Sequence, residues 1–485
     1  ILALAAAWQL PAIVAVPSGT VAFWGVSIAA FFAFAALLWF GLPGSGRRHN
    51  RAVWPLGFLY ACFLLLGKPM NTARALPVWD VVAGLSFLLA VAAFTAVLAA
   101  LLALSYRAVA WLTARRKPKP RDRETAKEPW LSRLTGNGFA AALIVLLCWV
   151  PVWLAFYPGT FRYDADTQYA SYVDCYLTTH HPLLHTLLMS WLLDLGNGWE
   201  SLTLGVALYS AAQMLCMAAI VGAACAWLRG RGVPTAFRVA VLLAFALWPL
   251  FPLWSFSATK DVLFAGLGML LCLQLADVWQ AGGAWFRSVW RVLGFTLTAA
   301  LMMLFRNNGV YALALALPFL VWAAKGFRLR ALALLALAVG LYALSNTLLV
   351  NATEAGSGSY VEMLSVPLQQ TVRAAVRGEL TDEQRATLDE LYADYGDDYA
   401  ALYTPMSADS AKWNLSEDVL SAEPGRYLNL WAQVGLANPR LYAEAFLEQN
   451  LPYYYPTSKM LYNIVLGVLP MELYELAEAP VLPAL

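Results

Sequence analysis

Long apolar stretches separated by short polar segments dominate the pattern of this chain. The stretches expected to cross a membrane are 1–17, 19–41, 52–68, 78–106, 137–156, 201–228, 234–251, 259–280, 289–305, 309–323 and 331–350. They are long enough for spanning helices rather than for the strands of a membrane barrel. Hydrophobic residues make up 61% of the chain and charged residues 13%, whereas soluble domains have roughly 45–50% and about 25%. The sequence therefore predicts an all-α, polytopic membrane helical bundle.

Arginine and lysine gather in alternate loops, which predicts how the chain crosses the membrane. The basic loops are 43–51, 107–135, 229–238, 281–291 and 325–330. Such loops remain on the cytoplasmic side. The alternation then places 69–77, 157–200, 252–258, 306–308 and everything from 351 onward on the outer side. A net charge of +2 gives no sign of nucleic acid, and no nucleic-acid partner is predicted.

Five segments follow from this pattern. We expect an N-terminal transmembrane helical unit over 1–106, a basic cytoplasmic loop over 107–136 and a transmembrane core over 137–350. The polar, aromatic segment 351–456 predicts a small helical extracytoplasmic domain, because it is too long for a plain loop. The C-terminal segment 457–485 contains a run, 459–471, that is too short and broken to predict a span.

The polar stretch 157–191 holds the first candidate residues, because charge between two membrane-like segments usually serves a function. If this stretch is helical, Asp164 and Gln168 share a face; if it is extended, Asp164 shares a face with Asp166. A carboxylate here could act as a general base toward a sugar hydroxyl, or help hold a divalent cation. The alternative is a solvated loop with helix-capping aspartates.

Three of the four histidines follow closely, as His180, His181 and His185. Pro182 suits the first position of a short helix lying along the membrane. The free amides of that helix would point toward the histidines and form a phosphate site. The histidines could bond phosphate or sugar, or bind a metal with the aspartates. Packing of interfacial histidines against lipid headgroups is the alternative.

Two outer turns carry further candidates. Asp261 suits the first turn of a helix, but the charge of Lys260 is unfavourable there, which favours an anionic ligand. Arg306 and Asn307 lie in a turn between two apolar stretches. Arg306 could bind phosphate or extend to the membrane surface, whereas a tight turn by itself explains Asn307.

The last candidates lie in the polar segment after the core. Gln369, Gln370 and Arg373 belong to one helical stretch, with Gln369 and Arg373 on one face. Paired amides and a guanidinium suit sugar hydroxyls and phosphate. A solvated helix face explains them equally well.

At these residues the chain resembles the GT-C superfamily of multi-pass membrane glycosyltransferases. The motifs that carry the resemblance are Asp164 in the first outer loop of the core, Thr-Lys-Asp-Val-Leu-Phe at 259–264 and Arg-Asn-Asn-Gly at 306–309. More narrowly, Pro-Gly, His-His-Pro, Ser-Val-Pro-Leu-Gln-Gln and Tyr-Tyr-Tyr-Pro look like a little-characterised group of bacterial envelope proteins near that superfamily.

The resemblance implies a transferase in the bacterial cytoplasmic membrane. A polyprenyl-phosphate-linked sugar would be the donor. The acceptor would be a glycan or a lipid-linked molecule of the cell envelope, and membrane lipids would surround the protein. Asp164 would deprotonate the acceptor in an inverting transfer on the outer face, with Asp166 as second catalytic candidate and both as candidate ligands of Mg²⁺ or Mn²⁺. The other expectations are a lipid-linked polysaccharide polymerase or ligase, and a lipid-linked sugar transporter or flippase. A transporter should place ionisable residues near the bilayer midplane, whereas here they gather at helix ends.

Overall fold

Helices account for all the regular secondary structure of the described chain. The computed structural model describes residues 1–14, 16–42, 52–77, 80–114, 129–161, 164–393, 395, 398–455 and 479–482. Helices long and apolar enough to cross a membrane number seven in these ranges: α2 (Val21–Gly41), α3 (Val53–Ala73), α4 (Val81–Ala114), α6 (Gly138–Ala155), α9 (Leu202–Gly230), α12 (Lys260–Ala281) and α15 (Arg328–Thr353). The chain is therefore a polytopic helical membrane protein, as the apolar pattern predicts.

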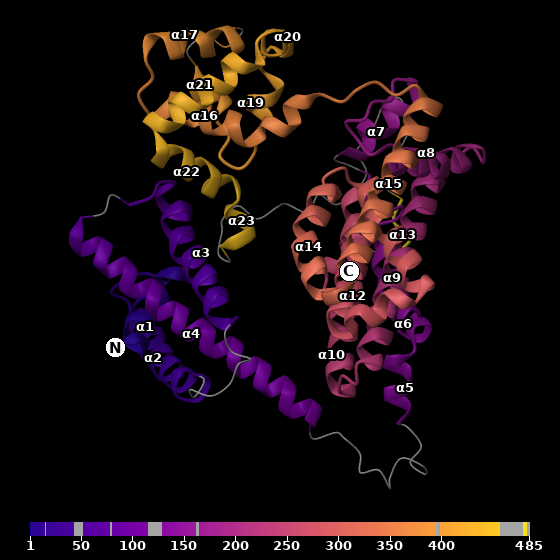
Figure 1. The fold of residues 1–485 in the computed structure, drawn as a ribbon, viewed down its shortest axis with the longest axis horizontal. Helices are drawn as coiled ribbons and strands as arrows, with labels where there is room; N and C mark the ends of the chain where they lie inside the picture. Colours follow the sequence, from indigo (N-terminus) through magenta and orange to yellow (C-terminus); the bar gives the residue numbers. More distant parts are fainter. Residues whose placement is uncertain are drawn as a thin grey trace. The chain divides into compact units, whose positions relative to one another are not determined.

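The chain forms two compact units, each of which combines separate parts of the sequence (Figure 1). The first unit comprises Ile1–Ala114 and Ser359–Asn463, and the second comprises Arg115–Gly358 and Ile464–Leu485. The sequence pattern had suggested that 1–106 and 351–456 form separate domains, whereas their contacts group them together. In the predicted loop 107–136, residues 107–114 belong to α4 and 130–136 are helical, and 115–128 lie outside the described residues. Most of the segment 457–485 also lies outside them.

The membrane part of the first unit is a bundle of α1 (Leu2–Ile13), α2, α3 and α4. Ala61, Leu65 and Phe94 belong to its core, and Tyr455 from the far end of the chain packs into the same core. A Cβ on Gly67 would lie 2.4 Å from the Tyr455 ring. Glycine at this position therefore allows the aromatic ring to rest directly on α3.

The rest of the first unit is a layer of short helices with its own core. The elements are η5 (Tyr360–Leu364), α16 (Ser365–Arg377), α17 (Asp382–Leu391), α18 (Tyr399–Leu402), α19 (Asp409–Trp413), α20 (Glu417–Ala422), α21 (Pro424–Ala437), α22 (Pro439–Gln449) and α23 (Leu451–Tyr454). Leu368 and Val372 of α16 are buried in that core. Thr381 and Gln384 form a reciprocal capping box that begins α17, the arrangement that their spacing favours.

The second unit is a bundle of membrane-length and shorter apolar helices. Besides α6, α9, α12 and α15, it contains α5 (Trp130–Gly136), α7 (Asp164–Val173), α8 (Leu183–Asn197), α10 (Thr235–Leu247), α11 (Leu250–Ser255), η3 (Gly282–Arg287), α13 (Val289–Phe305), α14 (Gly309–Ala323) and η4 (Lys325–Phe327). Figure 1 shows α7 and α8 at one end of the long helices and α5 at the other. The largest core cluster joins α12, α13, α14 and α15.

The two ends of this bundle differ in chemistry. At the end with α7, which we call the polar end, the Thr160 hydroxyl donates to Ser257 Oγ at 2.6 Å, and Thr179 N donates to Gly356 O at 2.9 Å. At the other end, which we call the basic end, Arg238 donates to Ser132 O at 3.1 Å. Which of the two ends faces the cytoplasm stays a prediction from the arginine-rich loops.

Candidate functional site

Asp164 is the first residue of α7, at the polar end of the second unit. The stretch is helical, so Asp164 and Gln168 share a face one turn apart. The Asp164 side chain is 48% exposed, whereas Gln168 is buried. The carboxylate of Asp166 accepts from Thr167, its immediate neighbour in the chain. Of the two aspartates, Asp164 is the one paired with a side chain on a distant element.

That distant partner is Lys260, the first residue of α12. The Lys260 ammonium forms an ion pair with Asp164 Oδ2 and lies 3.2 Å from Nδ1 of His181. Thr259 caps α12 by accepting from the amide of Asp261. The Lys260 side chain is only 12% exposed. The charge that is unfavourable at a helix start is therefore balanced by a carboxylate from another helix.

Burial and charge act together on the pKa values of these groups. Burial by itself would raise the pKa of Asp164, but Lys260, with smaller contributions from His181 and His180, lowers it below its usual value. Burial and the neighbouring Lys260 charge lower the pKa of His181 to about 4. At neutral pH the site therefore contains an ionised carboxylate, a charged ammonium and a neutral imidazole.

A second ion pair lies directly beside the first one along α12. Asp261 pairs with Arg306, which follows the end of α13. The guanidinium carbon of Arg306 lies 5.9 Å from the centre of the Phe264 ring. Asn307 Nδ2 donates to Thr179 O at 3.3 Å. Because Lys260 and Asp261 are consecutive, the two pairs bring α7, α12 and the end of α13 together.

The histidines take three different positions. His180 is exposed, with its ring 4.5 Å from that of His181, centre to centre. Pro182 is the N-cap of α8 rather than its first helical residue, and no side chain caps this helix end. His185 is fully buried. His181 is thus the histidine that contacts Lys260, and His185 belongs to a separate network.

That network is a buried chain of polar side chains. His185 Nδ1 lies 2.7 Å from the side-chain amide of Gln168, with Oε1 as the facing atom, and His185 Nε2 lies 2.7 Å from the Tyr209 hydroxyl. Tyr209 donates to Gln213 Oε1 at 2.8 Å. Burial, and to a smaller degree the charge of Lys260, lower the pKa of His185 to about 3. The imidazole is therefore neutral, and one of its nitrogens carries the proton.

Gln213 sets the direction of the hydrogen bonds in this chain. Its amide nitrogen donates to Ser255 O at 2.9 Å and to Ser257 O at 2.6 Å, so its oxygen must accept from Tyr209. The Tyr209 proton is then used, and His185 must donate from Nε2. Nδ1 becomes an acceptor, so the amide of Gln168 is turned to present its nitrogen to the ring. The carbonyl oxygen of Gln168 then lies in the buried position at which one atom of this side-chain amide has no hydrogen-bond partner.

Three residues of this region were missed by the sequence analysis. Tyr209 and Gln213 form the buried chain, and Asp194 accepts from the hydroxyl of Tyr172 at 2.7 Å, which ties α7 to α8. Two polar residues four apart in an apolar helix were a usable signal for Tyr209 and Gln213. The role of Asp194 depends on the fold and could not be deduced from its neighbours in sequence.

The candidates from the polar segment lie in the first unit and have partners there. Gln369 donates to Thr404 O, and Gln370 donates to Tyr442 O at 3.2 Å. Arg373 is fully buried and pairs with Glu444 and Glu448. These contacts give each side chain a structural role within the first unit. Their role in substrate binding stays a prediction.

The carboxylates near α7 do not form a metal site among the described residues. No group of three or more His, Cys, Asp or Glu side chains is placed there, or elsewhere in the described ranges, to hold a metal ion. The ammonium of Lys260 already occupies the place beside Asp164 that a cation would need. This donor set does not suit Mg²⁺ or Mn²⁺, and metal binding by Asp164 and Asp166 stays a prediction.

The comparisons with known proteins give a family and no close relative. Neither a curated protein nor a solved structure matches the chain. One family model matches residues 172–468, which include both histidines beside the site, Lys260, Arg306 and Arg373. Asp164 lies just before the matched region. Because the match covers more than half of its length, the chain belongs to DUF6020, a family of unknown function.

Proposed function

We propose that this protein is a membrane glycosyltransferase that moves a sugar from a polyprenyl-phosphate-linked donor to a cell-envelope acceptor on the outer face of the membrane. The observation that carries the proposal is the contact of Lys260 with Asp164 and His181, beside the pair of Asp261 and Arg306. A half-exposed carboxylate paired with a lysine, with an arginine paired to the next residue of α12, suits transfer from a phosphate leaving group. The resemblance to the GT-C superfamily supports the same reaction.

Asp164 is the general base in this proposal. One carboxylate oxygen takes the proton of the acceptor hydroxyl while the hydroxyl oxygen forms a bond to the anomeric carbon. The bond from that carbon to the phosphate oxygen breaks, and its electron pair leaves with the phosphate. The lowered pKa of Asp164 keeps the carboxylate ionised and ready to accept a proton at neutral pH.

Lys260 and Arg306 stabilise the departing phosphate. Lys260 has three N–H donors, of which one serves Asp164 and one faces the neutral His181 ring. The third remains for a ligand oxygen. A phosphate beside Lys260 also weakens the hold of this ammonium on Asp164, which makes the carboxylate a better base. Donor binding thereby prepares the acceptor side of the reaction.

The placement of charge favours an enzyme over the transporter. In the described second unit, the ion pairs lie at helix ends: Asp164, Asp261 and their partners at the polar end, and Asp277 with Arg231 at the basic end. A transporter of lipid-linked sugars should hold such groups near the bilayer midplane. A reaction at one membrane surface requires its ionisable groups at helix ends, which is where these groups lie.

A transfer assay with matched variants tests the proposal. The full-length protein would be reconstituted with a panel of labelled polyprenyl-phosphate sugars and with envelope acceptors, and wild type would be compared with Asp164→Asn and Asp166→Asn. We expect Asp164→Asn to lower the rate by about 10²–10⁴-fold and Asp166→Asn to keep it. Equal rates for Asp164→Asn and wild type would remove Asp164 as the base. Release of intact donor across the membrane without transfer would favour a flippase instead.

A further inference from the structure

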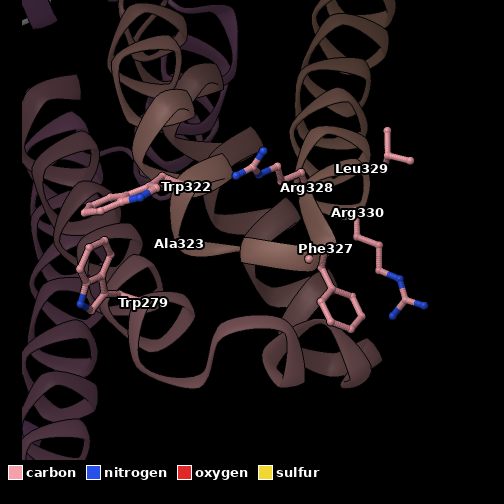
Figure 2. Close-up of a pocket in the computed structure, with 8 residues that line it drawn as sticks. Trp279, Trp322, Ala323, Phe327, Arg328, Leu329 and Arg330 are labelled. Atoms are coloured by element: carbon pink, nitrogen blue, oxygen red, sulfur yellow. The ribbon is translucent and has the colours of Figure 1, made fainter.

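A separate cavity of about 990 Å³ lies at the basic end of the second unit. It is lined by residues from the end of α12, the end of α14 and the start of α15: Trp279, Trp322, Ala323, Gly326, Phe327, Arg328, Leu329 and Arg330 (Figure 2). Along α12, the rise from Lys260 to Trp279 is about 28 Å. This arginine pocket is therefore distinct from the site around Asp164.

The polar part of the arginine pocket carries positive charge that no described residue neutralises. Arg328 and Arg330 are exposed, and no lining residue is acidic. No acidic side chain in the described ranges forms an ion pair with either guanidinium. Arg330 lies over the Phe327 ring, with 5.0 Å from its guanidinium carbon to the ring centre. An unpaired guanidinium group is well suited to bind a phosphate.

The two tryptophans place this pocket at the level of the lipid headgroups. Trp279 and Trp322 are 53% and 62% exposed, and their rings meet edge to face at 4.7 Å between centres. Figure 2 shows both rings on one side of the pocket, with the Arg328 guanidinium extending toward that side and the Arg330 side chain extending to the opposite side. Exposed tryptophans at the ends of membrane helices belong to the boundary between headgroups and hydrocarbon.

A second, apolar cavity of about 300 Å³ adjoins the arginine pocket, and the two share Trp279 and Ala323. Its other lining residues, all apolar, are Leu275, Ala276, Ala316, Phe319 and Leu320. They lie farther from the helix ends, and Phe319 is 67% exposed. An apolar groove between α12 and α14 therefore leads from the arginines toward the middle of the membrane.

We propose that the arginine pocket and this groove together bind one anionic phospholipid. The headgroup phosphate lies on Arg328, the arginine that extends toward the tryptophans, and one acyl chain lies in the groove beside Phe319. A soluble phosphate would use this arginine but not the groove, and a lipid without a phosphate would leave it unpaired. By the loop alternation this end faces the cytoplasm, where the membrane surface carries anionic lipids. The inference is independent of the reaction at Asp164.

Lipid titration of the purified full-length protein tests the inference. Bound lipid would be counted by native mass spectrometry with phosphatidylglycerol, phosphatidylcholine or water-soluble glycerol phosphate as the probe. We expect phosphatidylglycerol to bind preferentially and Arg328→Gln to weaken its binding about tenfold or more. Arg291→Gln is the matched control. Arg291 is also an exposed arginine at the basic end, near the start of α13, and it does not line the pocket.

Other outcomes would contradict the preference for an anionic lipid, the phosphate contact, the lipid as the ligand, or the groove. Equal binding of phosphatidylglycerol and phosphatidylcholine by wild type would remove the preference for an anionic lipid, because phosphatidylcholine also carries a phosphate. Unchanged binding by Arg328→Gln would remove this arginine as the phosphate site. Glycerol phosphate that competes as well as the whole lipid would identify a soluble ligand. Phe319→Ala should weaken phosphatidylglycerol and leave glycerol phosphate unchanged; equal lipid affinity in that variant would remove the groove.

Discussion

Lys260 forms an ion pair with Asp164, a residue 96 positions earlier in the chain, and in doing so joins the start of α12 to the start of α7. The contact makes two charged helix starts compatible with one another. It also makes the basicity of Asp164 depend on whatever else Lys260 binds.

Removal of the Lys260 charge should change both donor binding and the pH dependence of transfer. In wild type the ammonium lowers the pKa of Asp164, so Lys260→Met should raise that pKa. The base is active when ionised, so the loss of rate at acid pH should begin at a higher pH. Donor affinity should fall by about 1.5–3 kcal/mol. Lys260→Arg keeps the charge and should leave the acid side of the rate profile unchanged. A Lys260→Met profile identical to that of wild type would contradict the coupling between Lys260 and Asp164.

Acid should destabilise the fold through His185. Its pKa is about 3 in the folded protein and about 6.5 when unfolded. Between these values the unfolded chain binds more protons, so stability falls as the pH drops below about 6.5. His185→Gln should remove up to about 1.4 kcal/mol per pH unit from that slope, as measured by unfolding in detergent from pH 7.5 to 5.

Tyr209→Phe serves as the matched control for this slope. The variant leaves His185 Nε2 without its partner and should lower stability by about 1–3 kcal/mol at every pH. Because the imidazole remains buried, the slope with pH should persist. An equal slope in His185→Gln and wild type would show that other groups cause the acid sensitivity.

Arg373 should matter for the stability of the first unit. Its guanidinium donates to Glu444 and Glu448, both buried, and to the carbonyl of Arg74 at 2.6 Å. Arg373→Met leaves two carboxylates buried without this cation and should cost about 3–5 kcal/mol. Arg426→Gln, which breaks an exposed pair with Glu390, should cost at most about 1 kcal/mol. Lost substrate binding at unchanged thermal stability would instead assign Arg373 to the substrate.

Labelling of a native cysteine should report the side of the membrane. Cys175 is exposed and lies between α7 and α8. A membrane-impermeant maleimide should label it in intact cells after the outer barrier is opened, and Cys175→Ser should abolish that signal. With Cys175→Ser as background, Arg330→Cys should be labelled only after the membrane is permeabilised. The opposite pattern would reverse the topology.

The sequence could predict the membrane helices and the gathering of charge at their ends, because both depend on local composition. Each apolar stretch predicted to span contains a helix in the described residues. However, α1, α10, α13 and α14, with 12, 13, 17 and 15 residues, are shorter than the seven helices of membrane length. Partner choice could not be predicted in the same way. The sequence places the charged Arg306 in a turn, but its pairing with Asp261 depends on how the helices pack.

Arg373 illustrates a second limit. A glutamine–arginine face on an amphipathic helix has the same pattern whether it binds a ligand or pairs with buried acids. The glutamates that pair with Arg373 lie more than 70 residues later in the chain. Only the packing of α16 against α22 distinguishes the two roles, and spacing along one helix carries no information about that packing.

The buried chain from Gln168 to Gln213 has one further consequence, which concerns proton movement. Proton conduction requires each group in a hydrogen-bonded chain to pass a proton to the next group and then to rotate back to its first orientation. Here an amide stands at either end, and two carbonyl oxygens hold the Gln213 end in one orientation. Amides do not readily accept or release protons at ordinary pH, so a proton that reached His185 would have no exit through Gln213. The chain is an insulator across this part of the bundle, and it holds α7 in place without coupling the site to the proton gradient.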